Sequence, residues 1–427
     1  LIPLLRVMFT LQQQTLCAAP SNVAVCELAS RTIKDSLNNS GVLPPVPLSK
    51  YLLMGSATMR KAVTSATEDY LDRIYIESRL KRLRALAKSW EGSTEKLQQL
   101  LDEPPPNDSA ACSEWWHKLK TTVNIATAEI KGCARVVRDE APINFCERSP
   151  GELIRLVEEL GILKAALEAG TTPAVINTWS PCWVQAAQVM SLLRGRKGGP
   201  VFNLKALERR VVDAASLVFC TVSTRGSKAM SDKCFDVVII DEAAQLVEAE
   251  TLIVLADPHI KMLTLCGDHK QLPGTVISQT AQSKGYGRSL FERVFLQLQR
   301  REQPDNLPFT LLDTQFRMHP SISAWPNRRF YAGRLNDGVN SASRSLSLHA
   351  RVPVCAVYDV SWGQEERADG HSVYNAAEAE FVVQLVKELR SATTSEHCPL
   401  SVGIITPYRA HAELLRKRVA SCSRVEI

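Results

Sequence analysis

The chain has 427 residues, of which 45% are hydrophobic and 22% charged, and this is the composition of an ordinary globular protein with room for two or three domains. Its 51 basic and 45 acidic residues give a net charge of +6, which suits a polyanionic partner without arguing for one. No apolar run approaches the roughly 20 residues that a membrane-spanning helix needs. The opening residues LIPLLRVMF lack the basic leader and the cleavage site of a signal peptide, so we expect no membrane anchor and no membrane partner.

The twelve cysteines are scattered singly along the chain. No C-x-x-C pair and no Cys/His cluster with zinc-binding spacing occurs in the sequence. We therefore expect most of them to be reduced core residues, in a nuclear or cytoplasmic protein.

The N-terminal pattern predicts a helix, a strand, a loop and a second helix. LIPLLRVMFTLQQQ is typical of a helix, and TLCAA at 15–19 is a short apolar run. That run stops at Pro20-Ser21-Asn22, after which VAVCELASRTI has the apolar spacing of a helix.

Between about 63 and 195 the chain changes to charged, amphipathic segments such as YLDRIYIESRLKRLRALAKSW and GELIRLVEELGILKAALEAG. This predicts a helical insertion, and we favour a packing subdomain over a catalytic role for it. The tryptophans Trp115, Trp116, Trp179 and Trp183 are likewise more typical of a core than of a base-stacking surface.

Strand-like runs return after the basic, glycine-rich segment RGRKGG, namely SLVFCTV, DVVIID, MLTLCGD and FTLLD. A second set begins with VPVCAVYDV, continues through the helical pattern AAEAEFVVQLVKELR, and reaches SVGIITP. Alternation of strands with helices predicts an α/β protein with a parallel, doubly wound sheet.

The run VVII at 237–240 ends in two adjacent carboxylates, Asp241 and Glu242. Ligands of open parallel sheets bind beyond the carboxyl ends of the strands, so the pair is well placed to hold a magnesium nucleotide and to polarise an attacking water. An alternative of equal weight is that the acids cap the next helix. Neighbouring motifs have to separate these two interpretations.

Four further motifs follow strand-like runs. GDHKQLP is a polar turn in which Gln271 can lie beside a terminal phosphate. Taken alone, the same pattern is also typical of an ordinary surface turn. TQFRMHP holds Arg317, whose planar guanidinium suits phosphate charge or an ordinary ion pair. SNVAV and ITPYRAH place Ser21, Asn22 and Thr406 with backbone amides at strand ends, where nucleic-acid phosphates can be bound.

Together and in chain order, AAPSNVAVCELASR, VFCTVS, VVIIDEAAQ, CGDHKQLP, SLFERVF, TQFRMHPSIS, FYAGRL and VGIITPYRAH resemble the motif series of superfamily 1B helicases of the senataxin and up-frameshift-suppressor type. The resemblance covers residues 1–31 and 210–427 strongly and the insertion loosely. It implies two RecA-like domains that close over ATP and Mg²⁺ in a translocase acting on single-stranded RNA or DNA. Any protein partners are expected at the helical insertion.

Roles carry over from the resemblance by motif. Asp241 and Glu242 match the acidic pair that holds magnesium and activates water, and Gln271 matches the residue that senses the terminal phosphate. Arg317 matches an arginine that reaches the phosphates, and Phe316 stands where the family often has a tyrosine near the adenine. The residues that match nucleic-acid backbone contacts are Pro20, Ser21, Asn22, Thr221, Ser223, Thr406 and Pro407.

The resemblance also predicts the domains: 1–62 with 196–345 as a first RecA-like domain, 63–195 as the insertion, and 346–427 as an incomplete second RecA-like domain. The phosphate-binding pattern G-x-x-x-x-G-K-[ST] is absent, since no Gly-Lys dipeptide occurs in the sequence. We therefore expect a piece of a helicase, incomplete at both ends, that hydrolyses ATP poorly alone. The alternatives are a catalytically inactive module that binds nucleic acid or protein, and another RecA-like ATPase of the repair-nuclease kind.

Overall fold

The computed structural model describes residues 2–38, 46–55, 59, 69–102, 109–140, 158–165, 204–300, 308–339, 353–368, 372–391, 401–420, 422 and 424–427. The chain divides into two compact units, Leu1–Leu307 and Pro308–Ile427. The sequence placed the start of the second domain at 346 instead, and the three domain boundaries stay predictions.

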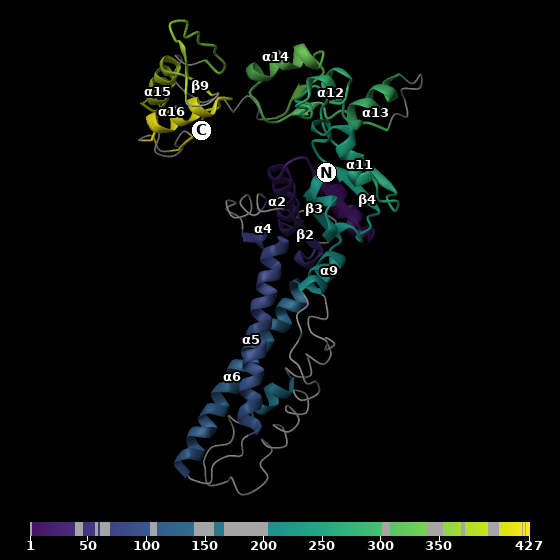
Figure 1. Ribbon diagram of the computed structural model, residues 1–427, viewed down its shortest axis with the longest axis vertical. Coiled ribbons are helices and arrows are strands. Elements are labelled where there is room, and N and C mark those ends of the chain that lie inside the picture. The colour runs from purple at the N-terminus through teal and green to yellow at the C-terminus, as the bar shows by residue number, and fades with distance from the viewer. Residues whose placement is uncertain are drawn as a thin grey trace. The chain divides into compact units, whose positions relative to one another are not determined.

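The first unit is built on a five-stranded sheet in which all neighbouring strands are parallel (Figure 1). In sheet order the strands are β2 (Tyr51–Met54), β3 (Leu217–Thr221), β1 (Thr15–Ala19), β4 (Val237–Ile240) and β5 (Met262–Leu265). Because the strands are parallel, their carboxyl ends meet at one edge and their amino ends at the opposite edge. We call these the carboxyl edge and the amino edge.

The sheet is buried because apolar side chains extend from both of its faces. Every residue of β1, β2 and β4 is buried, and the rings of Tyr51 and Phe219 stack with centroids 6.2 Å apart. Helices α1 (Ile2–Thr10) and α2 (Asn22–Asn38) pack on β1, and an ion pair of 3.2 Å joins Arg6 to Asp35 between them. The predicted strand at 15–19 and the two helices that flank it are confirmed.

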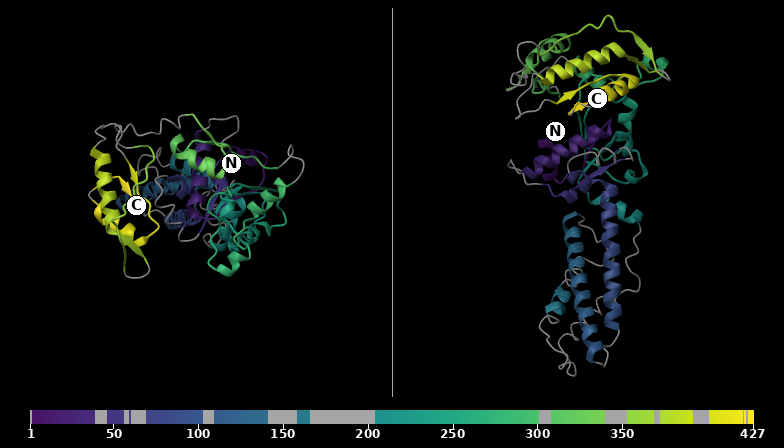
Figure 2. Two further views of the ribbon diagram at one scale, coloured as in Figure 1. Left: turned by 90° about the horizontal axis from the view of Figure 1, so that it is seen from above. Right: turned by 90° about the vertical axis from the view of Figure 1, so that its left-hand side faces the viewer.

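Two long helices form an arm that leads away from the sheet (Figures 1 and 2). They are α5 (Ile76–Asp102) and α6 (Ser109–Glu140), which lie side by side along their lengths. The short helix α4 (Asp69–Ile74) precedes them and packs on α2 and β2. Trp115 is buried and meets Trp116 edge to face at 5.3 Å. This agrees with the prediction of a packed helical segment; RGRKGG, Trp179 and Trp183 lie outside the described residues.

Short helices lie between and after the strands of the first unit. They are α9 (Leu204–Ala214), α10 (Val222–Arg225), η3 (Lys228–Met230), η4 (Ala243–Gln245), α11 (Glu248–Leu255), α12 (Gln279–Ser283) and α13 (Leu290–Gln299), and η1 (Leu48–Lys50) precedes β2.

Among its described residues, the second unit contains three strand pairs and three helices. The pairs are β6 (Thr314–Gln315) with β7 (Asn336–Asp337), β8 (Glu365–Arg367) with β9 (Val373–Asn375), and β10 (Val402–Gly403) with β11 (Val425–Glu426). The helices are α14 (Pro320–Phe330), α15 (Ala376–Ser391) and α16 (Arg409–Arg418), of which α15 confirms the predicted helix.

Two apolar runs of the second unit are not strands, contrary to the sequence prediction. FTLLD at 309–313 and the described part of VPVCAVYDV at 353–360 have no ladder partner among the described residues. Leu312 is 87% exposed and Val357 95% exposed. A strand exists only where a neighbour completes its hydrogen bonds, so an apolar run alone does not make one.

No helix within the described part of the chain is long and apolar enough to cross a membrane.

Candidate nucleotide and nucleic-acid site

The carboxyl edge brings the ends of three central strands into contact. Strand β1 lies between β3 and β4, with Ala19 paired to Thr221 and Ala18 paired to Ile240. The residue after Ile240 is Asp241, whose backbone N–H donates to Ala18 O at 2.9 Å. Three segments that are distant in sequence therefore emerge side by side, as the prediction for parallel strands required.

The loops after β1 and β3 both begin with a hydroxyl that caps the following helix. Ser21 Oγ accepts the Ala24 N–H at 3.2 Å, and Thr221 Oγ1 accepts the Thr224 N–H at 3.3 Å. Ser21 and Ser223 are exposed. The two loops predicted to bind the nucleic-acid backbone are thus adjacent and open to solvent.

Asp241 is half-buried at the end of β4. Its Oδ1 accepts the Glu242 N–H at 3.1 Å, and Oδ2 receives no hydrogen bond from any described residue. The neighbouring Cys17 thiol is fully buried. This burial, and to a smaller extent the nearby Cys220 and Asp241, raises the pKa of the thiol. The core below the carboxylate is therefore neutral, and Asp241 has one oxygen available for a ligand.

Glu242 occupies a left-handed backbone conformation, with φ 52° and ψ 37°. This region is unfavourable for a residue with a side chain, costs about 1–3 kcal/mol, and is concentrated at functional sites. Gln245 Nε2 donates to Glu242 Oε2 at 3.0 Å, and the Ala243 N–H donates to Cys266 O at 2.7 Å. Glu242 makes no side-chain cap to η4, so helix capping does not explain this acid.

The loop that carries Gln271 is held against the Asp241 turn at both of its ends. A Cβ on Gly267 would lie 2.9 Å from Ala244 N, and a Cβ on Gly274 would lie 3.1 Å from Val247 N. Only glycine lets the two backbones approach so closely. The sequence analysis assigned no role to these glycines, although Gly267 begins the quoted motif GDHKQLP and Gly274 directly follows it.

Within the loop, Gln271 Nε2 donates to Asp268 Oδ2 at 2.9 Å, and the Gln271 side chain is exposed. His269 lies 4.7 Å from the ring of Phe295 and 6.4 Å from that of Phe291, both on α13. Burial, more than any other cause, lowers the pKa of His269. A neutral imidazole packed on α13 therefore fixes the loop from its outer side.

The second unit holds the remaining predicted residues. Phe316 is 56% exposed, and its ring lies directly against Gly338, where a Cβ would collide with it. Arg317 is exposed, and its backbone N–H donates to Gln315 Oε1 at 2.9 Å. The convergence of Arg317 with Asp241 stays a prediction.

Thr406 and Pro407 follow β10 in the same unit. Thr406 Oγ1 accepts the Tyr408 N–H at 3.3 Å, and Pro407 is exposed. Their predicted contact with nucleic acid is compatible with this exposure and remains a prediction.

The Asp241 turn fits a magnesium ion. Mg²⁺ prefers carboxylate oxygens and keeps several waters, and Asp241 presents an uncommitted oxygen at a solvent-facing strand end, with the carboxylate of Glu242 next in sequence. The side chain that bonds Glu242 is the neutral amide of Gln245. Among the described residues, therefore, no lysine or arginine forms a hydrogen bond with either acid.

The five-stranded parallel sheet, with acids and polar loops at its carboxyl edge, defines a RecA-like α/β protein. Two family models, each described as an AAA domain, match residues 3–279 and 286–427. The chain belongs to the superfamily 1B helicases of the senataxin and up-frameshift-suppressor type.

Its relatives include helicases of plants and fungi. It is 36% identical over 231 residues to "Probable helicase MAGATAMA 3" of Arabidopsis thaliana, covering 52% of this chain and 27% of that protein. It is 36% identical over 218 residues to "Helicase sen1" of Schizosaccharomyces pombe, covering 50% of this chain and 12% of that protein. It is 34% identical over 209 residues to "ATP-dependent helicase upf1" of the same yeast, covering 48% of this chain and 21% of that protein. The matched stretch is a minor part of each relative.

Proposed function

We propose that this chain supplies the nucleotide and nucleic-acid binding edge of an ATP-dependent translocase that moves on single-stranded RNA or DNA and unwinds paired strands, in the nucleus or cytoplasm. One observation carries the proposal. The Asp241 turn, the Gln271 loop and the two capped loops after β1 and β3 all gather at the carboxyl edge of one parallel sheet.

The proposed roles follow the geometry. Asp241 Oδ2 would hold Mg²⁺, and the ion would supply positive charge that offsets charge on the phosphates. Glu242, kept in place by Gln245, accepts a proton from the attacking water. Gln271 exchanges its bond to Asp268 for one to the terminal phosphate, and Arg317 approaches from the second unit.

Nucleic acid is proposed to lie across the first-unit loops that contain Pro20, Ser21, Asn22, Thr221 and Ser223. The loops present hydroxyls and backbone amides rather than a base-reading surface. Such contacts bind phosphate and sugar and are largely indifferent to sequence. Thr406 and Pro407 are proposed to add a contact from the second unit, and protein partners are proposed for the α5–α6 arm.

We also propose that the 427 residues hydrolyse ATP slowly by themselves. The pattern G-x-x-x-x-G-K-[ST], whose amides and lysine bind most of the phosphate charge, does not occur in this sequence. Each charge-assisted hydrogen bond contributes about 1.5–3 kcal/mol, so affinity for Mg-ATP should be weak.

The test compares two aspartate variants in calorimetric titrations with Mg-ATP. Asp241→Asn removes the proposed metal oxygen and should weaken binding at least about tenfold, because the variant has no charged oxygen for the ion. Asp232→Asn is the matched control, since Asp232 is an exposed partner of Arg209 in the segment leading to the amino end of β4.

Equal affinities for the wild type and Asp241→Asn would contradict the metal role. Absence of Mg-ATP binding together with intact RNA binding would favour the alternative, a binding module without catalysis.

A further inference from the structure

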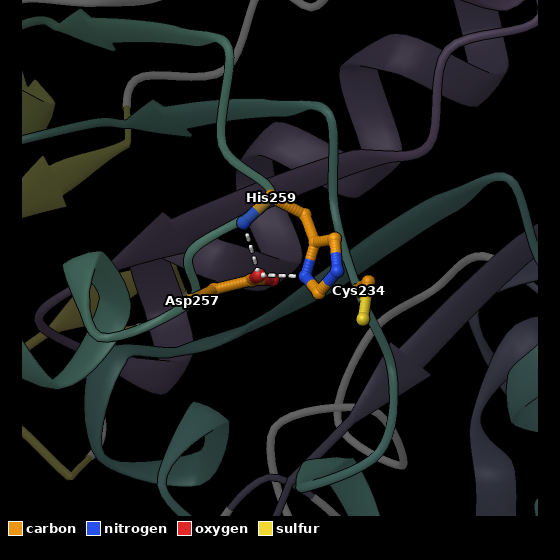
Figure 3. Close-up of side chains that lie close together, drawn as sticks. All are labelled: Cys234, Asp257 and His259. Atoms are coloured by element: carbon orange, nitrogen blue, oxygen red, sulfur yellow. Dashed lines mark hydrogen bonds and ion pairs between the residues drawn. The ribbon is translucent and has the colours of Figure 1, made fainter.

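A second cluster of ligand-type side chains lies at the amino edge of the sheet. Cys234 stands in the segment before β4, and Asp257 and His259 stand in the segment before β5 (Figure 3). One donor atom from each side chain lies within 4.8 Å of the others. The residues are separated in sequence and meet because β4 and β5 are parallel neighbours. This explains why the linear spacing of cysteine and histidine gave no signal.

We propose that Cys234 and His259 bind a divalent zinc-class ion, with Asp257 as the carboxylate that positions the histidine. The site lies at the opposite edge from the proposed nucleotide site and is independent of it. Binding exchanges the thiol proton of Cys234, which is released to solvent, for a sulfur–metal bond, and the second bond uses the lone pair of a neutral imidazole nitrogen.

Asp257 fixes the orientation of His259. Its Oδ1 accepts the backbone N–H of His259 at 2.9 Å and lies 3.0 Å from Nδ1 of the ring. A proton on Nδ1 leaves Nε2 as the acceptor nitrogen, and Figure 3 shows that nitrogen on the side of Cys234. Metal-binding histidines characteristically donate their other ring N–H to a carboxylate in this way.

The carboxylate is itself rigidly held. Asp257 Oδ2 accepts the Phe235 N–H at 3.0 Å and lies 3.4 Å from Arg225 Nη2, and its side chain is only 2% exposed. Arg225 therefore faces Oδ2, while His259 faces Oδ1. The positive charge of Arg225 is directed at the oxygen that is remote from the proposed ion.

The two proposed ligands have uncommitted electron pairs. The His259 side chain is 61% exposed, and no described residue donates a hydrogen bond to its Nε2. Cys234 is exposed, and among the described residues its thiol makes one contact, a 4.0 Å approach to Asp232 O. Zinc bonds of about 2.3 Å to sulfur and about 2.0 Å to nitrogen, at a tetrahedral angle, hold the two ligand atoms roughly 3.5 Å apart. Rotation of the exposed Cys234 side chain brings its sulfur to that distance, while Asp257 keeps His259 in place.

The donor set favours a soft or borderline metal. Thiolate and imidazole select zinc-class ions over magnesium or calcium, which prefer oxygen. With two direct protein ligands, water or an external ligand fills the other positions of the tetrahedron. We therefore expect an exchangeable ion rather than one that the fold requires.

Cobalt(II) is the probe for the first experiment, because cobalt bound to thiolate absorbs in the near ultraviolet. Titration of the reduced 427-residue chain should give this band, with saturation at one equivalent and reversal by excess zinc. Cys234→Ser should abolish the band, and His259→Ala should weaken binding at least about tenfold. Cys355→Ser is the matched control, because Cys355 is also exposed but lies in the other unit; its titration should equal that of the wild type.

A second measurement uses the unaltered chain and so does not depend on how the variants fold. Zinc should slow alkylation of Cys234 by iodoacetamide, read by peptide mass spectrometry, while alkylation of Cys355 proceeds at its zinc-free rate. The proposal is overturned if the wild type gives no cobalt–thiolate band, if folded Cys234→Ser or His259→Ala binds as tightly as the wild type, or if zinc protects both cysteines equally.

Discussion

The polar side chains at the two edges of the sheet differ in how completely they are hydrogen-bonded. At the amino edge, Asp257 is bonded to Phe235 N–H, Arg225 and His259, and Lys233 Nζ donates to three acceptors. At the carboxyl edge, Asp241 keeps one oxygen without a hydrogen bond from the described residues.

The difference follows from what each edge has to do. Burying a charge is costly unless it is paired, so polar groups that only stabilise the fold bond to one another. A group that binds a ligand must keep part of its capacity for that ligand. Uncommitted oxygen, nitrogen or sulfur atoms therefore distinguish the proposed sites, including the exposed Cys234 and His259, from the structural network beside them.

The largest expected effect comes from breaking the network at the amino edge. Asp257→Ala removes the acceptor of a buried backbone N–H and leaves Arg225, itself 8% exposed, without its counter-ion. The free energy of unfolding should fall by about 3–5 kcal/mol, measured by denaturant titration. Asp232→Ala, in an exposed ion pair, should cost less than about 1 kcal/mol. Similar destabilisation of the two variants would show that the buried network around Asp257 contributes no more stability than an exposed ion pair.

A smaller effect is expected at Lys233, which is 7% exposed and donates to Gln14 Oε1, Asp213 O and Ala215 O at 2.9, 3.0 and 2.9 Å. Lys233→Met leaves those oxygens without their donor and should cost about 1–3 kcal/mol at neutral pH. The pKa of Lys233 is lowered from 10.5 to about 8, and burial of the ammonium group is the largest cause.

The lowered pKa gives this prediction a pH signature. Between pH 8 and 10.5 the unfolded chain binds more protons at Lys233 than the folded chain does, so raising the pH favours folding at this site. The difference in unfolding free energy between the wild type and Lys233→Met should therefore grow across that interval and stay level below it. A difference that shrinks with rising pH would contradict the assignment.

Sequence patterns predicted β1 and β4 well, because these strands are fully buried and read as continuous apolar runs. TLCAA at 15–19 and VVII at 237–240 are strands with those bounds. The same reasoning was wrong at FTLLD, where Leu312 is 87% exposed. Apolar character shows what a run can bury, but a strand also needs a partner along its edge.

The candidate site was predictable in part. Motif order singled out Asp241, Glu242 and Gln271, whose roles stay predictions, and the parallel sheet explains why their segments are neighbours. The left-handed backbone of Glu242 and the close approach at Gly267 depend on how two turns pack, which no local pattern encodes. The pairing of Cys234 with His259 likewise depends on the register of β4 and β5.

The most direct measurement of the contrast between the edges introduces a carboxylate at each. Ser223 is exposed in the first turn of α10 after β3, and Ser231 is exposed in the segment leading to the amino end of β4. Binding of fluorescent single-stranded RNA is followed by anisotropy at several salt concentrations. Ser223→Asp should weaken binding and reduce the slope of log K against log salt by roughly 0.7 for each phosphate that is no longer bound. Ser231→Asp should match the wild type in affinity and slope. Equal weakening in both variants, or RNA affinity that is unchanged in Ser223→Asp, would contradict the assignment of nucleic-acid binding to the carboxyl edge.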